Sequence, residues 1–146
     1  MPCLFVVKLK AGTELENRPG QTARITKILA DAGVNICWVT IANSGSFGVM
    51  KFLVAERDTA MRVLKEKGVM VSLLEALAVE VPDKPGSLQA VADLLGRNNI
   101  NLDNCSGFVA HNRAILIIEV HPLAQARAIL EQQGFHLLTQ EEMLRL

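Results

Sequence analysis

The chain has few aromatic residues, no excess of charge of either sign and no long apolar run. Among its 146 residues, 15 Lys and Arg face 15 Asp and Glu, and 4% are aromatic. A neutral chain has no global field for a phosphate backbone, and few rings are present on which bases could stack, so we predict no nucleic-acid partner. The apolar stretches, such as 114–118, are shorter than the roughly 18 to 20 residues that span a bilayer. We therefore predict no membrane association.

Cysteine is also scarce. Cys3, Cys37 and Cys105 lie far apart in the sequence, which favours neither a disulfide framework nor a zinc motif. The N-terminus reaches Lys8 only after a short apolar run, the wrong order for a signal peptide. A reducing cytoplasm is therefore the expected location.

No group of residues in the sequence suggests catalysis. Cys37 and Cys105 fall on predicted strands without a nearby His, and His111, His121 and His136 fall at predicted element ends, where a structural or surface role is typical. No glycine-rich phosphate loop is present. We predict that the chain is not an enzyme and holds neither a metal ion nor a cofactor.

The main feature of the sequence is an internal repeat. Asn17-Arg18-Pro19-Gly20 is echoed by Asp83-Lys84-Pro85-Gly86, in which Pro85 follows Pro19 by 66 residues. The same offset pairs further residues without a gap: Leu29 with Leu95, Asn35 with Asn101, Val54 with Val120, and Gly68 with Gly134. Two copies of one unit therefore fill the chain, and we expect domains at 1–72 and 73–146.

Each copy predicts the same order of elements. In the first copy we expect a strand at 4–10, continued at 14–16 after a turn at 11–12, then a helix after Gly20, a hairpin over 35–55, a helix at 59–67 and a strand from Val69. In the second copy the corresponding elements are a strand at 77–81, a helix after Gly86, a hairpin over 101–120, a helix at 122–133 and a strand from Phe135. The order βαββαβ predicts an α+β protein of two ferredoxin-like domains, each an antiparallel sheet with both helices on one face.

The third strand of each copy predicts which face is buried. Alternate apolar residues, Met50, Phe52 and Val54 in the first copy and Leu116, Ile118 and Val120 in the second, should face the helices. On the opposite face the second copy also carries Ile115 and Ile117, and a strand that is apolar on both faces usually has both covered. We expect this face to be covered and favour a homodimer contact, with a single exposed Ile117 as the ordinary alternative.

The two loop-and-helix segments resemble the opening of the ACT domain, a small regulatory module that senses amino acids. The resemblance rests on 15–20 followed by 29–36, and on 79–88 followed by 98–102, so it covers essentially the whole chain. The chain is similar to free-standing tandem ACT proteins, and the similar segments include Phe47-Gly48 after the hairpin turn and the tail at 139–142.

The resemblance implies that paired ACT domains hold a small effector between them, usually an amino acid. The residues fit such a ligand, because backbone amides after Gly20 and Gly86 offer donors for a carboxylate, while Asn17 and Asp83 offer acceptors for an ammonium group. The predicted ligand-binding residues are Asn17, Arg18, Gly20, Gln21, Thr22, Asn35 and Ile36 in the first copy, and Asp83, Lys84, Gly86, Ser87, Leu88, Asn101 and Leu102 in the second.

Polar residues in this set can also have a purely structural role. Asn17 and Asp83 are also typical of Asx turns or helix caps, and Asn35 and Asn101 are typical of the turn that leads from a helix into a strand. The two copies also differ, since Asn99 replaces Gly33, so their sites need not be equivalent.

Three functions agree with these observations. The first is a non-catalytic regulatory protein that binds an amino acid; we expect it to be a homodimer and to have a metabolic enzyme as a further partner. The second is a regulatory or interaction subunit of an amino-acid biosynthetic enzyme such as acetolactate synthase. The third is an enzyme on a ferredoxin-like scaffold, because a fold does not determine a function.

Overall fold

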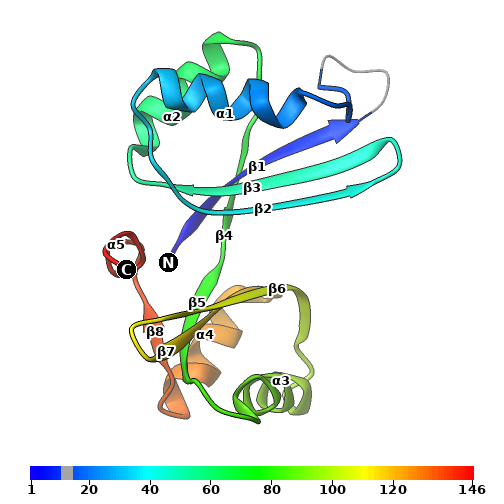
Figure 1. Ribbon diagram of the computed structural model, residues 1–146. Helices are drawn as coiled ribbons and strands as arrows, with labels where there is room; N and C mark the ends of the chain where they lie inside the picture. The colour runs from blue at the N-terminus through cyan, green and yellow to red at the C-terminus, as the bar shows by residue number, and fades with distance from the viewer. Residues whose placement is uncertain (11–14) are drawn as a thin grey trace. The chain divides into compact units, whose positions relative to one another are not determined.

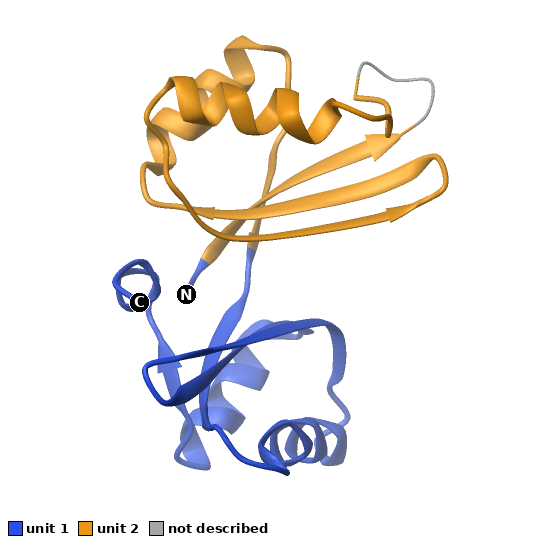
Figure 2. Ribbon diagram, viewed as in Figure 1, with its two compact units in different colours: residues 1–2, 75–146 blue, residues 3–74 orange. Residues whose placement is uncertain are grey.

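The computed structural model describes residues 1–10 and 15–146, which form two compact units (Figures 1 and 2). Residues 3–74 make up one unit, called domain 1 below, and residues 1–2 with 75–146 make up the other, domain 2. The first residues belong to domain 2 because the Pro2 carbonyl accepts a hydrogen bond from the Ala76 amide at 2.9 Å. The turn predicted at 11–12 and the start of the strand predicted at 14–16 lie outside the described residues.

Domain 1 has the predicted βαββαβ order. Its elements are β1 (Cys3–Lys10), α1 (Gln21–Asp31), β2 (Ile36–Ser44), β3 (Phe47–Val54), α2 (Arg57–Glu66) and β4 (Ser72–Glu75). The sheet order is β2-β3-β1-β4, and β3 is antiparallel to both β1 and β2. The core includes the predicted Met50, Phe52 and Val54, which pack with Ile25 and Leu29 of α1.

Domain 2 repeats this topology. Its elements are β5 (Leu77–Pro82), α3 (Ser87–Arg97), β6 (Asn101–Ala110), β7 (Arg113–His121), α4 (Leu123–Gln132), β8 (His136–Leu138) and α5 (Gln140–Leu144). The sheet order is β6-β7-β5-β8. Leu116, Ile118 and Val120 lie in the core as predicted, together with Val91 and Leu95 of α3. The α+β fold of two ferredoxin-like domains is therefore confirmed.

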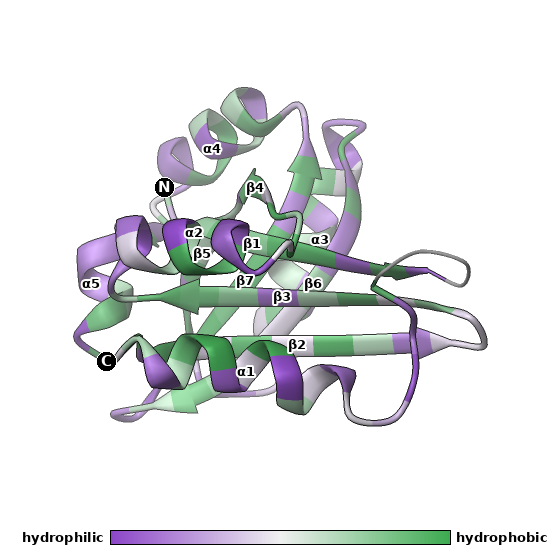
Figure 3. Ribbon diagram, turned by 90° about the horizontal axis from the view of Figure 1, so that it is seen from above, coloured by the Kyte–Doolittle hydropathy of each residue, from purple (hydrophilic) through white to green (hydrophobic). Residues whose placement is uncertain are grey.

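Helical periodicity and left-handed residues define the first helix of each domain. The ribbon of α1 alternates between hydrophobic and hydrophilic segments, as expected of a helix with one face on a sheet (Figure 3). After the helices, Gly33 and Asn99 take positive φ values of 74° and 59°, the left-handed conformation that glycine and asparagine favour at a helix end. His111 and Asn112, in the turn between β6 and β7, also have positive φ.

Two strand starts and one helix differ from the sequence predictions. The closing strands begin later than expected, at Ser72 and His136, because the residues directly after Gly68 and Gly134 are used to leave the preceding helix. The short helix α5 was not predicted. It begins with a capping box in which the Thr139 hydroxyl accepts from the Glu142 amide at 3.1 Å and the Glu142 carboxylate accepts from the Thr139 amide at 3.2 Å.

The apolar outer face of β7 is covered, as its sequence pattern indicates. Ile115 and Ile117 are 0% and 2% exposed. Both residues lie outside the core cluster of domain 2, and the homodimer contact expected over this face stays a prediction.

Candidate functional site

The candidate site in each domain is the loop before the first helix and the first turn of that helix. Both helices begin at a left-handed glycine with φ of 90°, Gly20 before α1 and Gly86 before α3. Neither helix has a side-chain cap or an acidic residue in its first turn. The first amides of a helix point outward without intrahelical partners and carry partial positive charge, so both ends offer donors to an anion.

Asn17 has a structural role in domain 1. Its side-chain amide nitrogen donates to the carbonyl oxygens of Gly45 at 2.8 Å and Phe47 at 3.2 Å. These bonds join the loop before α1 to the turn between β2 and β3. The side-chain oxygen of Asn17 accepts no hydrogen bond from a described residue, so that oxygen is the part of Asn17 that remains for a ligand.

The first residue of each helix makes the same bond in both domains. In domain 1 the buried Gln21 side chain donates from Nε2 to the Glu16 carbonyl at 3.0 Å, and in domain 2 the Ser87 hydroxyl donates to the Pro82 carbonyl at 2.6 Å. Each bond spans five residues and closes the loop before the helix. Gln21 and Ser87, both predicted to bind ligand, therefore shape the loop.

Asp83 differs from its counterpart Asn17. A carboxylate cannot donate a hydrogen bond to the turn carbonyls, and no hydrogen bond joins the Asp83 side chain to a described residue. Asp83 is exposed, as are its neighbours Lys84 and Gly86, and Leu88 in the first turn of α3 is 51% exposed. The Ser87 amide donates to the Lys84 carbonyl at 3.4 Å, so domain 2 presents an ionised acceptor and an apolar side chain beside the next two amides of α3. Arg18 lies exposed in the corresponding loop of domain 1, and Thr22 is half-buried.

The structure does not bring the second group of predicted residues to this loop in the same domain. Asn35 and Ile36 follow the C-terminal end of α1, and Asn101 and Leu102 follow the C-terminal end of α3. A helix of 11 residues, the length of both α1 and α3, is about 16 Å long, so the two groups are at opposite ends of it.

The apolar members of the second group are used by their own domains. Ile36 packs against the core of domain 1 and Leu102 against the core of domain 2. The Asn35 backbone amide donates to the Glu56 carboxylate at 2.9 Å, and its side-chain amide approaches the Cys37 sulfur at 3.8 Å. Asn101 is exposed at the start of β6.

The two strand cysteines are weak nucleophiles. Burial, and next the negative charge of Glu56, raise the pKa of the Cys37 thiol, which the hydrogen bond from Asn35 offsets in part. Burial also raises the pKa of the Cys105 thiol. Both thiols are therefore protonated at neutral pH. Among the described residues no three His, Cys, Asp or Glu side chains group closely enough to hold a metal ion.

Sequence reasoning missed the close packing around Gly48 in β3. A Cβ atom at Gly48 would lie 2.3 Å from the side-chain oxygen of Asn43 and 3.3 Å from Asn17. The missing side chain therefore lets Asn17 reach the hairpin turn. The signal was present in the repeat, since the position equivalent to Gly48 in domain 2 is Ala114, where Asp83 replaces Asn17.

An exposed apolar surface beside α1 was also missed. β2 is an edge strand in the described sheet, and its Val39 and Ile41 lie opposite the core residues Phe52 and Met50, on the helix face of the sheet. Val39 is nevertheless 45% exposed and Ile41 is 43% exposed. The edge of domain 1 therefore presents apolar side chains next to unpaired strand backbone.

The comparisons with known proteins agree with this architecture. A family model described as an ACT domain pair matches residues 7–146. A crystal structure of a protein from Bacteroides thetaiotaomicron superposes with a TM-score of 0.88 at 22% identity, over 99% of this chain and 96% of that one. The ligand-free regulatory subunit of aspartate kinase from Thermus thermophilus gives a TM-score of 0.61 at 16% identity, over 91% and 93% of the two chains.

A third similar structure is part of a larger enzyme. Aspartokinase III from E. coli, in complex with aspartate and ADP, gives a TM-score of 0.52 at 17% identity, and the match covers 88% of this chain but 30% of the enzyme. No curated protein matches the sequence at a significant level. None of the helices in the described ranges is both long and apolar enough to cross a membrane.

Proposed function

Because the chain belongs to the family of ACT domain pairs, we propose that it is a non-catalytic regulatory protein that binds a free amino acid between ACT domains. Family membership supports a regulatory role, and the two uncapped helix starts support the class of ligand. Binding of the effector would change the affinity of the chain for a partner or its state of assembly.

The observation that carries this proposal is the contrast between the helix starts. α5 begins with a complete capping box, whereas α1 and α3 begin with a glycine, no side-chain cap and no acidic residue in the first turn. The donors that a capping side chain would use are therefore available to a ligand carboxylate at α1 and α3.

Domain 2 is the better candidate for the occupied site. An amino acid needs an acceptor for its ammonium group and an apolar surface for its side chain, in addition to donors for its carboxylate. Asp83 supplies an ionised acceptor and Leu88 an exposed apolar side chain beside the start of α3. In domain 1 the Asn17 amide is already bonded to the hairpin turn, so the first loop has fewer polar groups left to bind a ligand.

A second ACT domain would complete the ligand site. Asn35 and Asn101 are at the far ends of α1 and α3 from Asn17 and Asp83, so an asparagine and a loop of one domain cannot share a small ligand. Two domains whose first helices run antiparallel would place the loop of one beside the asparagine of the other. Asn35 and Asn101 would therefore have their predicted ligand-binding roles only in an assembly of domains.

A homodimer through the β2 edges would provide such an assembly for domain 1. Val39 and Ile41 would be covered by it, and unpaired strand edges readily pair with a second copy. Isologous contacts of this kind are the commonest route to a soluble oligomer. An effector that bridges two chains would bind the dimer preferentially and stabilise it.

A second candidate is a separate regulatory subunit of an amino-acid biosynthetic enzyme. The chain covers 93% of the regulatory subunit of aspartate kinase from Thermus thermophilus. A chain of this fold and extent therefore serves elsewhere as a separate regulatory subunit. Recovery of one large catalytic chain with the tagged protein, at a fixed ratio and in an effector-dependent manner, would support this candidate, and recovery of the protein by itself would contradict it.

Calorimetry of the purified protein against each standard amino acid tests the main proposal. We expect one amino acid, or a chemically related group, to bind with an affinity that falls in Asp83→Ala and Leu88→Ala. Absence of heat with every amino acid, together with unchanged amide spectra, would contradict it.

A further inference from the structure

A cavity of about 560 Å³ lies beside β1 in domain 1 and reaches Leu15 in the loop that precedes α1. Its walls come from β1, from Leu15 and from the segment that leads from α2 into β4. The residues that line it are Val6, Lys8, Lys10, Leu15, Gly68, Met70, Val71 and Ser72. Its volume is in the range of about 300 to 1,000 Å³ that is typical of small-molecule sites.

The lining of the cavity is apolar with a cationic rim. Leu15, Met70 and Val71 supply apolar surface, and Met70 is 84% exposed. Lys8 is exposed and has no acidic partner among the described residues, and none of the described lining residues is acidic. A cation beside an apolar surface favours an organic anion, because the two parts of such a ligand are satisfied by different walls.

The repeat supplies an internal comparison for this cavity. Phe5 lies opposite Phe52 in domain 1, and Leu77 lies opposite Ile118, the residue equivalent to Phe52, in domain 2. Counting along the strands from these pairs makes Glu80 the equivalent of Lys8. By the 66-residue repeat, His136 corresponds to Met70 and Arg113 to Phe47.

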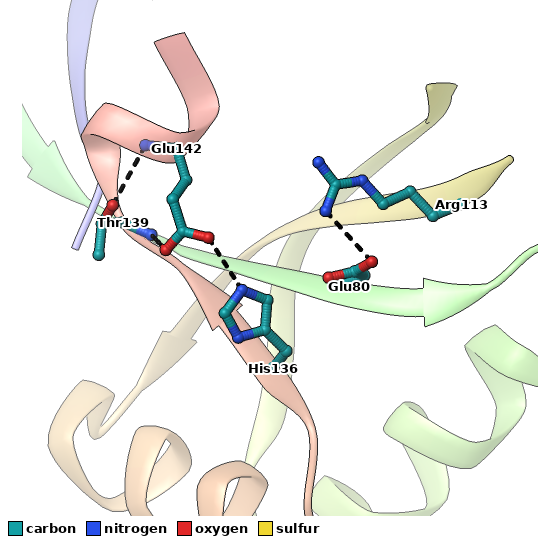
Figure 4. A network of polar contacts seen from close by, with 5 residues as sticks. All are labelled: Glu80, Arg113, His136, Thr139 and Glu142. Carbon is teal, nitrogen blue, oxygen red and sulfur yellow. Dashed lines mark hydrogen bonds and ion pairs between the residues drawn. The ribbon is translucent and has the colours of Figure 1, made fainter. Parts of the chain in front are cut away.

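In domain 2 the equivalent positions take part in two separate polar pairs. The Arg113 guanidinium pairs with the Glu80 carboxylate at 3.2 Å, and the His136 Nε2 lies 2.9 Å from the Glu142 carboxylate at the start of α5 (Figure 4). Glu80 and His136, the equivalents of Lys8 and Met70, therefore each have a polar partner. Domain 1 has Lys8 and Met70 instead, and no helix follows β4, because the chain passes from Glu75 directly into β5.

We propose that the cavity beside β1 is a second ligand site, and that it takes a small monocarboxylate with an apolar body and no ammonium group. The carboxylate would lie at Lys8, and the apolar body would contact Leu15, Met70 and Val71. A free amino acid suits this site less well, because none of the described lining residues has an acidic side chain that accepts its ammonium group. The site goes beyond the proposed amino-acid site and shares no residue with it.

One carbon skeleton in three charge states tests the chemistry of the site. The probes are 4-methylpentanoate, its neutral amide 4-methylpentanamide, and leucine, which adds an ammonium group. Amide and methionine-methyl NMR spectra of the full chain locate each probe, because the Gly68 amide and the Met70 methyl group lie in the cavity wall. We expect 4-methylpentanoate to shift both signals in a saturable way, at lower concentrations than the amide or leucine.

Variants of Lys8 separate charge recognition from general apolar contact. An exposed ion pair is worth up to about 1 kcal/mol, so Lys8→Met should weaken 4-methylpentanoate about fivefold and leave 4-methylpentanamide unchanged. Lys8→Glu, which introduces the residue type of domain 2, should abolish binding of the carboxylate. Lys65→Met, at an exposed lysine of α2 outside the cavity, is the matched control and should change neither affinity.

The outcomes that would overturn the site are distinct from failure of the amino-acid proposal. Equal binding of the carboxylate and the amide, or equal effects of Lys8→Met and Lys65→Met, would refute charge recognition. Absence of shifts at Gly68 and Met70 with 4-methylpentanoate would refute the location. Asp83→Ala should leave all three results unchanged, since Asp83 belongs to the other domain and to the other proposed site.

Discussion

The side-chain amide of Asn17 lies 2.8 Å from the carbonyl oxygen of Gly45 and holds the loop before α1 against the β2–β3 turn. The equivalent residue of the second domain, Asp83, has no donor with which to make this contact. One position of the repeat is thus a brace in domain 1 and an exposed carboxylate in domain 2. The two loops share a backbone conformation and differ in what they offer to a ligand.

The brace predicts a loss of stability in domain 1. Asn17→Ala removes two hydrogen bonds to backbone carbonyls and should lower the free energy of unfolding by about 1 kcal/mol. Asn17→Asp should cost a similar amount, because a carboxylate does not donate to these carbonyls. Urea unfolding measures both changes. Asp83→Ala is the matched control, and a loss as large as that of Asn17→Ala in this control would contradict the assignment of a brace.

The exposed carboxylate predicts a loss of affinity in domain 2. Asp83→Ala should weaken amino-acid binding by about 1 to 2 kcal/mol, and by more than Asn17→Ala, because an ionised acceptor holds an ammonium group more strongly than an amide does. Calorimetry with the identified amino acid measures both affinities. If both variants fold and bind as the parent chain does, these side chains only shape their turns.

Substitutions of Leu88 and Leu95 in α3 should have opposite effects on stability and on amino-acid affinity. Leu95 is fully buried in the core, so Leu95→Ala should lower the free energy of unfolding by about 2 to 5 kcal/mol. Leu88 is 51% exposed, so Leu88→Ala should change stability little and reduce amino-acid affinity. Unfolding curves and calorimetry on the same two variants test this. A stable Leu88→Ala variant with full affinity would remove Leu88 from the site.

The C-terminal helix α5 should depend on pH through Glu142. The hydrogen bond with His136, and next the one from the Thr139 amide, lower the pKa of the Glu142 carboxyl. A lowered carboxyl pKa stabilises the folded state above the ordinary pKa of about 4.3, and this stabilisation is lost as the pH falls through the folded-state pKa. We therefore expect α5 to fray on acidification.

Amide hydrogen exchange of Met143 and its neighbours in α5 measures this effect. Glu142→Ala, which removes the acceptor, should already show fast exchange at neutral pH, whereas Glu141→Ala, which alters an acidic residue of the same turn outside these contacts, should behave as the parent chain does. Equal protection of α5 in both variants would show that the Glu142 contacts do not hold the helix.

Much of the fold could be predicted because the two copies carry the same periodic signals. Apolar alternation at Met50, Phe52 and Val54 recurs 66 residues later, and glycine or asparagine at 33 and 99 ends the first helix in each copy. What covers Ile115 and Ile117 could not be predicted, because alternation shows that a face is apolar and not what packs on it. α5 was missed although Thr139 and Glu142 have the spacing of a capping box.

The candidate site was predicted in composition and less well in geometry. The repeat indicated the loops at 17–20 and 83–86, and the structure places both at uncapped helix starts. The repeat did not reveal that Asn35 and Asn101 lie one helix length away from these loops, nor that Asn17 bonds to Gly45. Such contacts join residues far apart in the sequence, and a pattern along one chain carries no information on them.

Amide NMR spectra of the full chain, recorded with each standard amino acid, test the central claim most directly. We predict that one amino acid, or a related group, shifts the amides at the start of α3, including Leu88 and Gln89, and that Asp83→Ala weakens this response. Shifts confined to residues away from both helix starts, or no saturable shift with any amino acid, would contradict the proposal that these loops bind a free amino acid.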